Sequence, residues 1–133
     1  MFVQSAYSGG ARARYQAVDF ASLVEGATAH GLISIMFDQL MAAIDTMAAA
    51  QRSGNRAKMI ELQAKACTIL IGLETSLDYE KGGELAINLA LVYREGRRLL
   101  RQGCNASDPQ VISQARDMLF EIVDAWRQIN PAD

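Results

Sequence analysis

The sequence predicts an all-α protein, an antiparallel up-down-up-down four-helix bundle. Half of the 133 residues are hydrophobic but only 7% are aromatic, and Ala, Leu, Ile and Met, which favour helix, dominate. Apolar residues recur at steps of three and four in four successive segments. These segments have similar lengths and short connections, which favour antiparallel packing of consecutive helices.

The first two helices are predicted from their caps and apolar stripes. Thr28 is a plausible N-cap for the first helix, which is expected to end near Ser53-Gly54, and Asn55 can cap the second. The first stripe consists of Ile33, Phe37, Leu40, Ile44 and Met47. The second consists of Met59, Leu62, Ala66, Ile69 and Leu73, and this helix is expected to run to Gly82-Gly83.

The double glycine is expected to form a tight corner before the third helix. Gly82 and Gly83 release the backbone from right-handed helix geometry, and Glu84 would then lie in a first turn, where the helix dipole favours negative charge. The third stripe consists of Leu85, Leu89, Val92, Gly96, Leu99 and Gly103. Glycines at core-facing positions indicate close approach of a neighbouring helix or a ligand.

The fourth helix is predicted to begin at Ser107-Asp108-Pro109, because a capping side chain there precedes a proline at the first helical position. Its stripe consists of Ile112, Ala115, Leu119, Ile122, Trp126 and Ile129. The bundle is expected to occupy residues 28–133. Residues 1–27 lack a sustained period and are expected to form a mobile N-terminal arm with a few apolar anchors.

The overall composition limits the partners and the compartment. The 13 basic and 15 acidic residues nearly balance, so we expect no nucleic-acid partner. No signal peptide or run of about 18 apolar residues is evident, so we expect no membrane insertion and a cytoplasmic location. Cys67 and Cys104 lack metal or redox spacing and are expected to be reduced core thiols.

No set of residues indicates catalysis, a cofactor or a metal, and we expect none of them. The single histidine, His30, is expected to be exposed or to cap a helix. The acidic residues without an evident base or nucleophile partner are expected to form solvated helix surface; they are Glu61, Glu74, Glu84, Glu121 and Asp124. Lys81-Gly82-Gly83 is too short for a phosphate-binding loop.

Two surfaces leave alternatives open. A basic face on the third helix is either solvated or a contact for an acidic partner; it comprises Arg94, Arg97, Arg98 and Arg101. Several apolar residues exceed what a closed four-helix core needs, so either a fifth element covers them or a groove remains open. They are Leu32, Met36, Leu70, Leu77, Ile87, Leu91 and Tyr93.

Over roughly residues 15 to 129 the chain resembles the FliS-type flagellin export chaperones. The resemblance lies in a series of short matches in the family's order and spacing: Tyr15-Gln16, Ala27-Thr28, Leu32-Ile33, Phe37-Asp38, Leu77-Asp78, Lys81-Gly82-Gly83-Glu84, Asn88-Leu89, Leu91-Val92-Tyr93 and Trp126. The chain departs from the family at Ala29, Phe37 and Glu95, where the family commonly has a proline, a tyrosine and often a second aromatic residue.

The resemblance implies a cytosolic chaperone that binds the disordered C-terminal segment of flagellin in an apolar groove. It would prevent premature filament polymerisation and deliver flagellin to the flagellar type III export apparatus, with the export gate as a further candidate partner. The alternative is a helical-bundle adaptor or regulatory protein that binds another helical partner or self-associates, including as a homodimer when free. Neither function requires an enzyme or a cofactor.

The resemblance also implies candidate flagellin-binding residues. Tyr15 would cover the groove in the free protein and move when the client arrives; otherwise it only pins the arm to the bundle. Asn88 would contact the client backbone, or else be a surface amide. Leu89, Val92 and Tyr93 belong to either the groove or the core.

Overall fold

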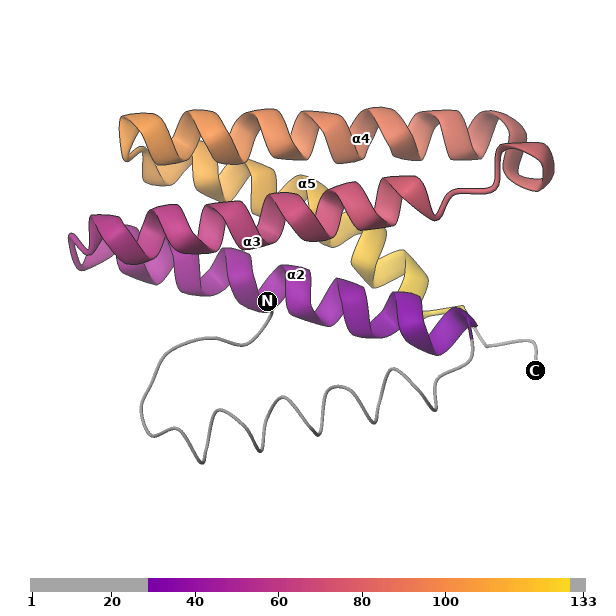
Figure 1. Cartoon of the computed structure of the whole chain (residues 1–133), viewed down its shortest axis with the longest axis horizontal. Coiled ribbons are helices and arrows are strands. Elements are labelled where there is room, and N and C mark those ends of the chain that lie inside the picture. Colours follow the sequence, from indigo (N-terminus) through magenta and orange to yellow (C-terminus); the bar gives the residue numbers. More distant parts are fainter. Residues whose placement is uncertain (1–28, 130–133) are drawn as a thin grey trace.

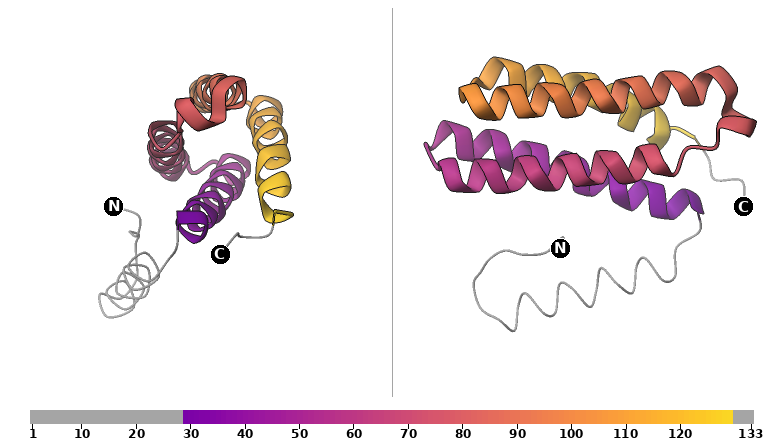
Figure 2. Two further views of the ribbon diagram at one scale, coloured as in Figure 1. Left: turned by 90° about the vertical axis from the view of Figure 1, so that its right-hand side faces the viewer. Right: turned by 45° about the horizontal axis from the view of Figure 1, so that its top comes forward.

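The computed structural model describes residues 29–129, which form four helices (Figure 1). These are α2 (Ala29–Arg52), α3 (Arg56–Thr75), α4 (Tyr79–Ala106) and α5 (Pro109–Arg127). Each helix runs antiparallel to the one before it, and seen end-on the four surround one core (Figure 2, left). The predicted four-helix bundle is confirmed. Thr28 and the predicted arm, residues 1–27, lie outside the described residues.

Side-chain caps start three of the helices. The carboxamide or carboxylate oxygens of Asn55, Asp78 and Asp108 accept hydrogen bonds from backbone N–H groups two or three residues later, at 3.1, 3.0 and 2.9 Å. Each cap satisfies a donor that has no partner within its own helix. Pro109 occupies the first turn of α5, as the sequence predicts.

The double-glycine corner differs from the prediction. The second helix does not extend to Gly82-Gly83 but ends at Thr75, because Asp78 caps a new turn that starts at Tyr79. Gly83 then interrupts α4 with φ 53° and ψ −128°, a conformation that essentially only glycine adopts. The glycine therefore kinks the start of α4, and the chain reverses direction before it.

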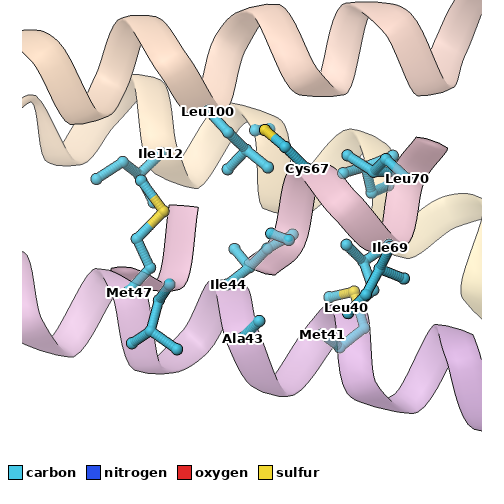
Figure 3. Close-up of a cluster of buried hydrophobic side chains, with 14 of the residues drawn as sticks. Leu40, Met41, Ala43, Ile44, Met47, Cys67, Ile69, Leu70, Leu100 and Ile112 are labelled. Atoms are coloured by element: carbon cyan, nitrogen blue, oxygen red, sulfur yellow. The ribbon is translucent and has the colours of Figure 1, made fainter. Parts of the chain in front are cut away.

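The core is built from the predicted apolar stripes. Leu40, Ile44 and Met47 of α2 are fully buried against α3 and the other helices (Figure 3). Cys67 and Cys104 are free and buried, as expected. Leu70 and Tyr93, which were candidates for an open groove, also belong to the buried core. Two of the seven surplus apolar residues are therefore part of the buried core, while Ile87 and Leu91 remain more than half exposed.

The apolar composition of α2 is itself explained by this core. Within the described part of the chain, His30–Arg52 is long and apolar enough, by length and composition only, to cross a membrane. Asp38 and Asp45 interrupt this helix, so it contains no uninterrupted run of about 18 apolar residues. The residues that make the helix apolar include Leu40, Ile44 and Met47, which are fully buried in the bundle.

Close packing of α4 against α5 explains the two core-facing glycines of the third stripe. A Cβ atom on Gly103 would lie 2.8 Å from Cγ1 and 3.1 Å from the backbone nitrogen of Ile112. A Cβ atom on Gly96 would lie 3.1 Å from Cδ1 of Leu119. The neighbour that requires these glycines is therefore α5, not a ligand.

An ion-pair cluster joins the end of α3 to α4. The Glu74 carboxylate accepts from Arg94 at 2.7 Å and from Arg97 at 2.9 Å, with only 17% of the Glu74 side chain exposed. These hydrogen bonds hold the pKa of Glu74 below its ordinary value. Glu74 is therefore not simply solvated surface, and it pairs with two of the four arginines of the predicted basic face.

We expect Gly103→Ala to lower the free energy of unfolding by about 1–3 kcal/mol, because the added methyl group meets backbone as well as side chain. The helix-propensity gain of roughly 1 kcal/mol offsets only part of this cost. Gly96→Ala is the matched control and should cost less, because it meets only the flexible end of Leu119. Urea denaturation measures both, and a Gly103→Ala protein as stable as wild type would contradict the close approach.

We expect Glu74→Gln to lower the free energy of unfolding by about 0.5–1 kcal/mol at neutral pH. A carboxyl group with a depressed folded pKa stabilises above its unfolded pKa, and this contribution is lost as the pH falls through the folded value. The difference from wild type should therefore shrink progressively below about pH 4.3. Denaturant titrations across this range test it; a difference that persists at low pH would show that the charge is not responsible.

Candidate functional site

An apolar groove of about 660 Å³ opens between the first half of α4 and the second half of α5. The α4 wall consists of Leu85, Leu89, Val92 and Tyr93. The α5 side consists of Met118, Glu121, Ile122, Ala125 and Trp126, followed by Ile129. Ile33 and Phe37 of α2, with Leu73 and the residues 76–78 that follow α3, complete the lining.

The groove opens here because α5 diverges from α4. The two helices touch closely at Gly103 and Gly96, but α5 then crosses the bundle diagonally and ends beside the start of α2 (Figures 1 and 2). The second half of α5 therefore packs on α2 and leaves the facing half of α4 uncovered. A tight contact at one end and divergence at the other together produce an elongated apolar depression.

Polar and aromatic contacts hold the end of α5 against α2. The indole N–H of Trp126 donates to the Ser34 hydroxyl at 2.8 Å, and Arg127 pairs with Asp38 at 3.2 Å. The Trp126 ring also stacks on His30 at 4.3 Å between centroids and meets Phe37 edge-on at 5.9 Å. These contacts keep the groove from closing by movement of α5 toward α4.

His30 is neither exposed nor a cap, contrary to the prediction. It lies within the first turn of α2, and its ring is partly buried against Trp126. Its Nε2 atom is buried and has no hydrogen-bond partner among residues 29–129. The tertiary contact with α5, which is distant in sequence, decides its environment.

The structure separates the candidate binding residues of α4. Leu89 and Val92 are partly buried and line the groove, while Tyr93 is 3% exposed and belongs to both the core and the groove lining. Burial raises the pKa of Tyr93 to about 12, because the ionised hydroxyl would lose its hydration. Asn88 is exposed and is not part of the lining, and Tyr15 lies outside the described residues.

Several residues of the predicted core stripes line the groove. Leu85 is 65% exposed and lies at the groove instead of the core, because the kink at Gly83 starts the long part of α4 just before it. Ile122 and Trp126 of α5 and Ile129 after it, from the fourth predicted stripe, also line the groove. The signal that could have identified the residues of α5 is the breadth of its apolar face, which includes the fully buried Val123 beside Ile122.

The arrangement suits binding of an apolar segment. Its lining is hydrophobic apart from Ser76 and two carboxylates, Asp78 and Glu121. Within residues 29–129, no three His, Cys, Asp or Glu side chains gather in a way that could hold a metal ion. A concave apolar surface between helices is the form in which proteins accept an amphipathic helix.

Three of the four arginines on the basic face of α4 form ion pairs. Besides the Glu74 pairs of Arg94 and Arg97, Arg98 pairs with Glu95 at 2.6 Å and donates to Gln102 at 3.1 Å. Arg94 and Arg97 therefore tie α4 to α3, the contacts of Arg98 lie within α4, and the face has less free charge than its sequence indicates.

Comparison with known proteins agrees with this geometry. Residues 11–133 match the family model described as flagellar protein FliS. The flagellar secretion chaperone FliS of Salmonella typhimurium is 36% identical over 118 residues, which cover 88% of this chain and 87% of that protein. The FliS of Vibrio cholerae is 29% identical over 122 residues (92% of this chain, 90% of that protein), and FliSB of Pseudomonas aeruginosa is 29% identical over 127 residues (93% and 98%). Because the match spans nearly the whole chain, this protein belongs to the FliS family of flagellar secretion chaperones.

Proposed function

We propose that this protein is a cytosolic export chaperone that binds the disordered C-terminal segment of flagellin in the α4–α5 groove. Binding would cover the apolar face that flagellin otherwise buries only in the filament, and would so prevent premature polymerisation. The complex would then be delivered to the flagellar type III export apparatus, whose gate is a candidate second partner. The observation that carries the proposal is the open apolar groove in a chain of this family.

Mass action is sufficient for this activity. A chaperone present in excess of its dissociation constant lowers the concentration of free client, and nucleation of a filament depends on that concentration. No nucleotide or catalytic group is needed.

In this proposal the α4 residues have different roles. Leu89 and Val92, with part of their surface still accessible, contact the client directly. Tyr93 supports them from beneath, since it is almost wholly buried. Asn88 is exposed beside Leu89 and offers its amide to a client backbone that extends over the edge of α4. Tyr15 covers the groove in the free protein and leaves it when flagellin binds.

A second candidate, a helical-bundle adaptor or self-associating protein, is favoured by apolar side chains away from the groove. Ile71 of α3 and Ile87 and Leu91 of α4 are 53%, 52% and 55% exposed, and none of them lines the groove. If this second surface is the functional one, substitutions in the groove should leave partner binding unchanged.

Calorimetric titration with the C-terminal segment of flagellin from the same organism should give a one-to-one complex. Its heat-capacity change should be clearly negative, because apolar surface is buried. Tyr15→Ala should bind roughly threefold to tenfold more tightly, because an aromatic side chain no longer competes for the groove. No binding at micromolar concentrations would reject the chaperone proposal; an unchanged affinity of Tyr15→Ala would reject only the covering role.

Leu85→Gln and Leu91→Gln form a matched pair, since both leucines are exposed on α4, at 65% and 55%, and only Leu85 lines the groove. We expect Leu85→Gln to weaken flagellin binding roughly tenfold, from lost burial of one large side chain, and Leu91→Gln to bind as wild type. Neither change should alter the denaturation midpoint by much. If instead Leu91→Gln alone loses binding, the second surface and not the groove is the binding site.

A further inference from the structure

The charged residues that line the groove are all negative. Of the residues that line it, only Asp78 and Glu121 are charged at neutral pH, and both are carboxylates. Asp78 precedes α4 and Glu121 belongs to α5, so the two carboxylates come from different elements. None of the basic residues that the structure describes is part of the lining.

Four arginines of α4 and α5 are already paired with other carboxylates. Arg127, at the end of α5, pairs with Asp38 at 3.2 Å. Arg116 pairs with Asp45 at 3.0 Å and lies 3.8 Å from Asp117. Arg94 and Arg97 are both held by Glu74. The charged side chains that line the groove are therefore all negative, whereas the whole chain carries a net charge of only −2.

Glu121 has fewer hydrogen-bond partners than Asp78. It forms no hydrogen bond or ion pair within residues 29–129, whereas one carboxylate oxygen of Asp78 already accepts the Lys81 N–H at 3.0 Å. On α5, Glu121 stands about one turn after Met118 and one turn before Ala125, and both of these line the groove. Its side chain therefore stands on the same edge of α5 as two groove residues.

A bound apolar segment would cover part of this edge and remove water from Glu121. Removing water from an unpaired carboxylate costs free energy, and a cation placed beside it offsets this cost. Charged groups at the rim of an apolar contact therefore select partners and set their register more than they add affinity.

From this arrangement we infer that the flagellin segment bound in the groove carries a lysine or arginine beside its apolar face, and that this cation pairs with Glu121. Glu121 is then a specificity-determining residue, and Asp78 adds to the attraction from the other side. The inference rests on the proposed function, since it assigns the chemistry of the segment that the groove accepts.

A double-mutant cycle tests the pair. The first axis compares wild type with Glu121→Gln; the second compares the C-terminal flagellin segment with versions in which each Lys or Arg is replaced in turn by Gln. We expect Glu121→Gln to bind the unchanged segment about threefold to tenfold more weakly at low salt. One substituted segment should bind both proteins equally, because it lacks the pairing cation. The loss should shrink between about 0.05 and about 0.5 M salt.

Two variants serve as controls. Asp124→Asn removes a carboxylate from the same helix outside the groove lining, where it accepts from Gln128 at 3.2 Å, and should bind as wild type. Asp78→Asn removes the second groove charge and keeps the helix cap, because Asn caps as well as Asp. It should weaken binding less than Glu121→Gln does.

The possible failures are distinguishable. If Glu121→Gln binds the segment as tightly as wild type at low salt, or if no Lys or Arg substitution couples to it, the inference is wrong and the chaperone proposal stands. If wild type does not bind the segment at all, the proposed function and the inference both fail.

Discussion

The close approach of α4 and α5 at Gly96 and Gly103 is the contact on which the rest of the structure depends. The absent Cβ atoms let Ile112 and Leu119 pack directly on the α4 backbone. This contact fixes the position of α5 at its beginning. Because α5 leaves it at an angle, the same contact determines where the two helices separate and therefore where the groove opens.

Keeping an apolar groove open in water requires that its walls be held apart. The end of α5 is fixed to α2 by the Trp126–Ser34 hydrogen bond, the stack on His30 and the Arg127–Asp38 pair. The opposite wall is fixed by Glu74, which ties α4 to α3 through two arginines. These polar contacts lie around the groove, while the core that residues 29–129 form beneath it is made of hydrophobic residues. The bundle thus leaves apolar surface unburied at one end without losing a continuous core.

The groove is suited to recognition by shape, apolar contact and a few rim charges. Exposure of Leu85 and partial exposure of Leu89 and Val92 provide apolar surface at the α4 wall, and the methionine Met118 can adapt its side chain to different shapes on the other side. Asp78 and Glu121 give this surface a single sign of charge. A client that lacks a stable fold of its own can adjust to such a site. The free-energy cost of ordering the client is offset by the apolar area that it buries.

By itself, the sequence determined the four helices, their antiparallel order, the caps at Asn55 and Asp108 and most of the core. Each of these depends on local periodicity or on hydrogen bonds between residues a few positions apart. It also indicated that Gly96 and Gly103 face a close neighbour, but not that the neighbour is α5. Only the tertiary structure decided the stacking of His30 on Trp126, the pairing of Glu74 with Arg94 and Arg97, and the division of apolar residues between core and groove. Those features depend on crossing angles between helices distant in the chain, and an apolar stripe has the same spacing whether its partner helix stays close or diverges.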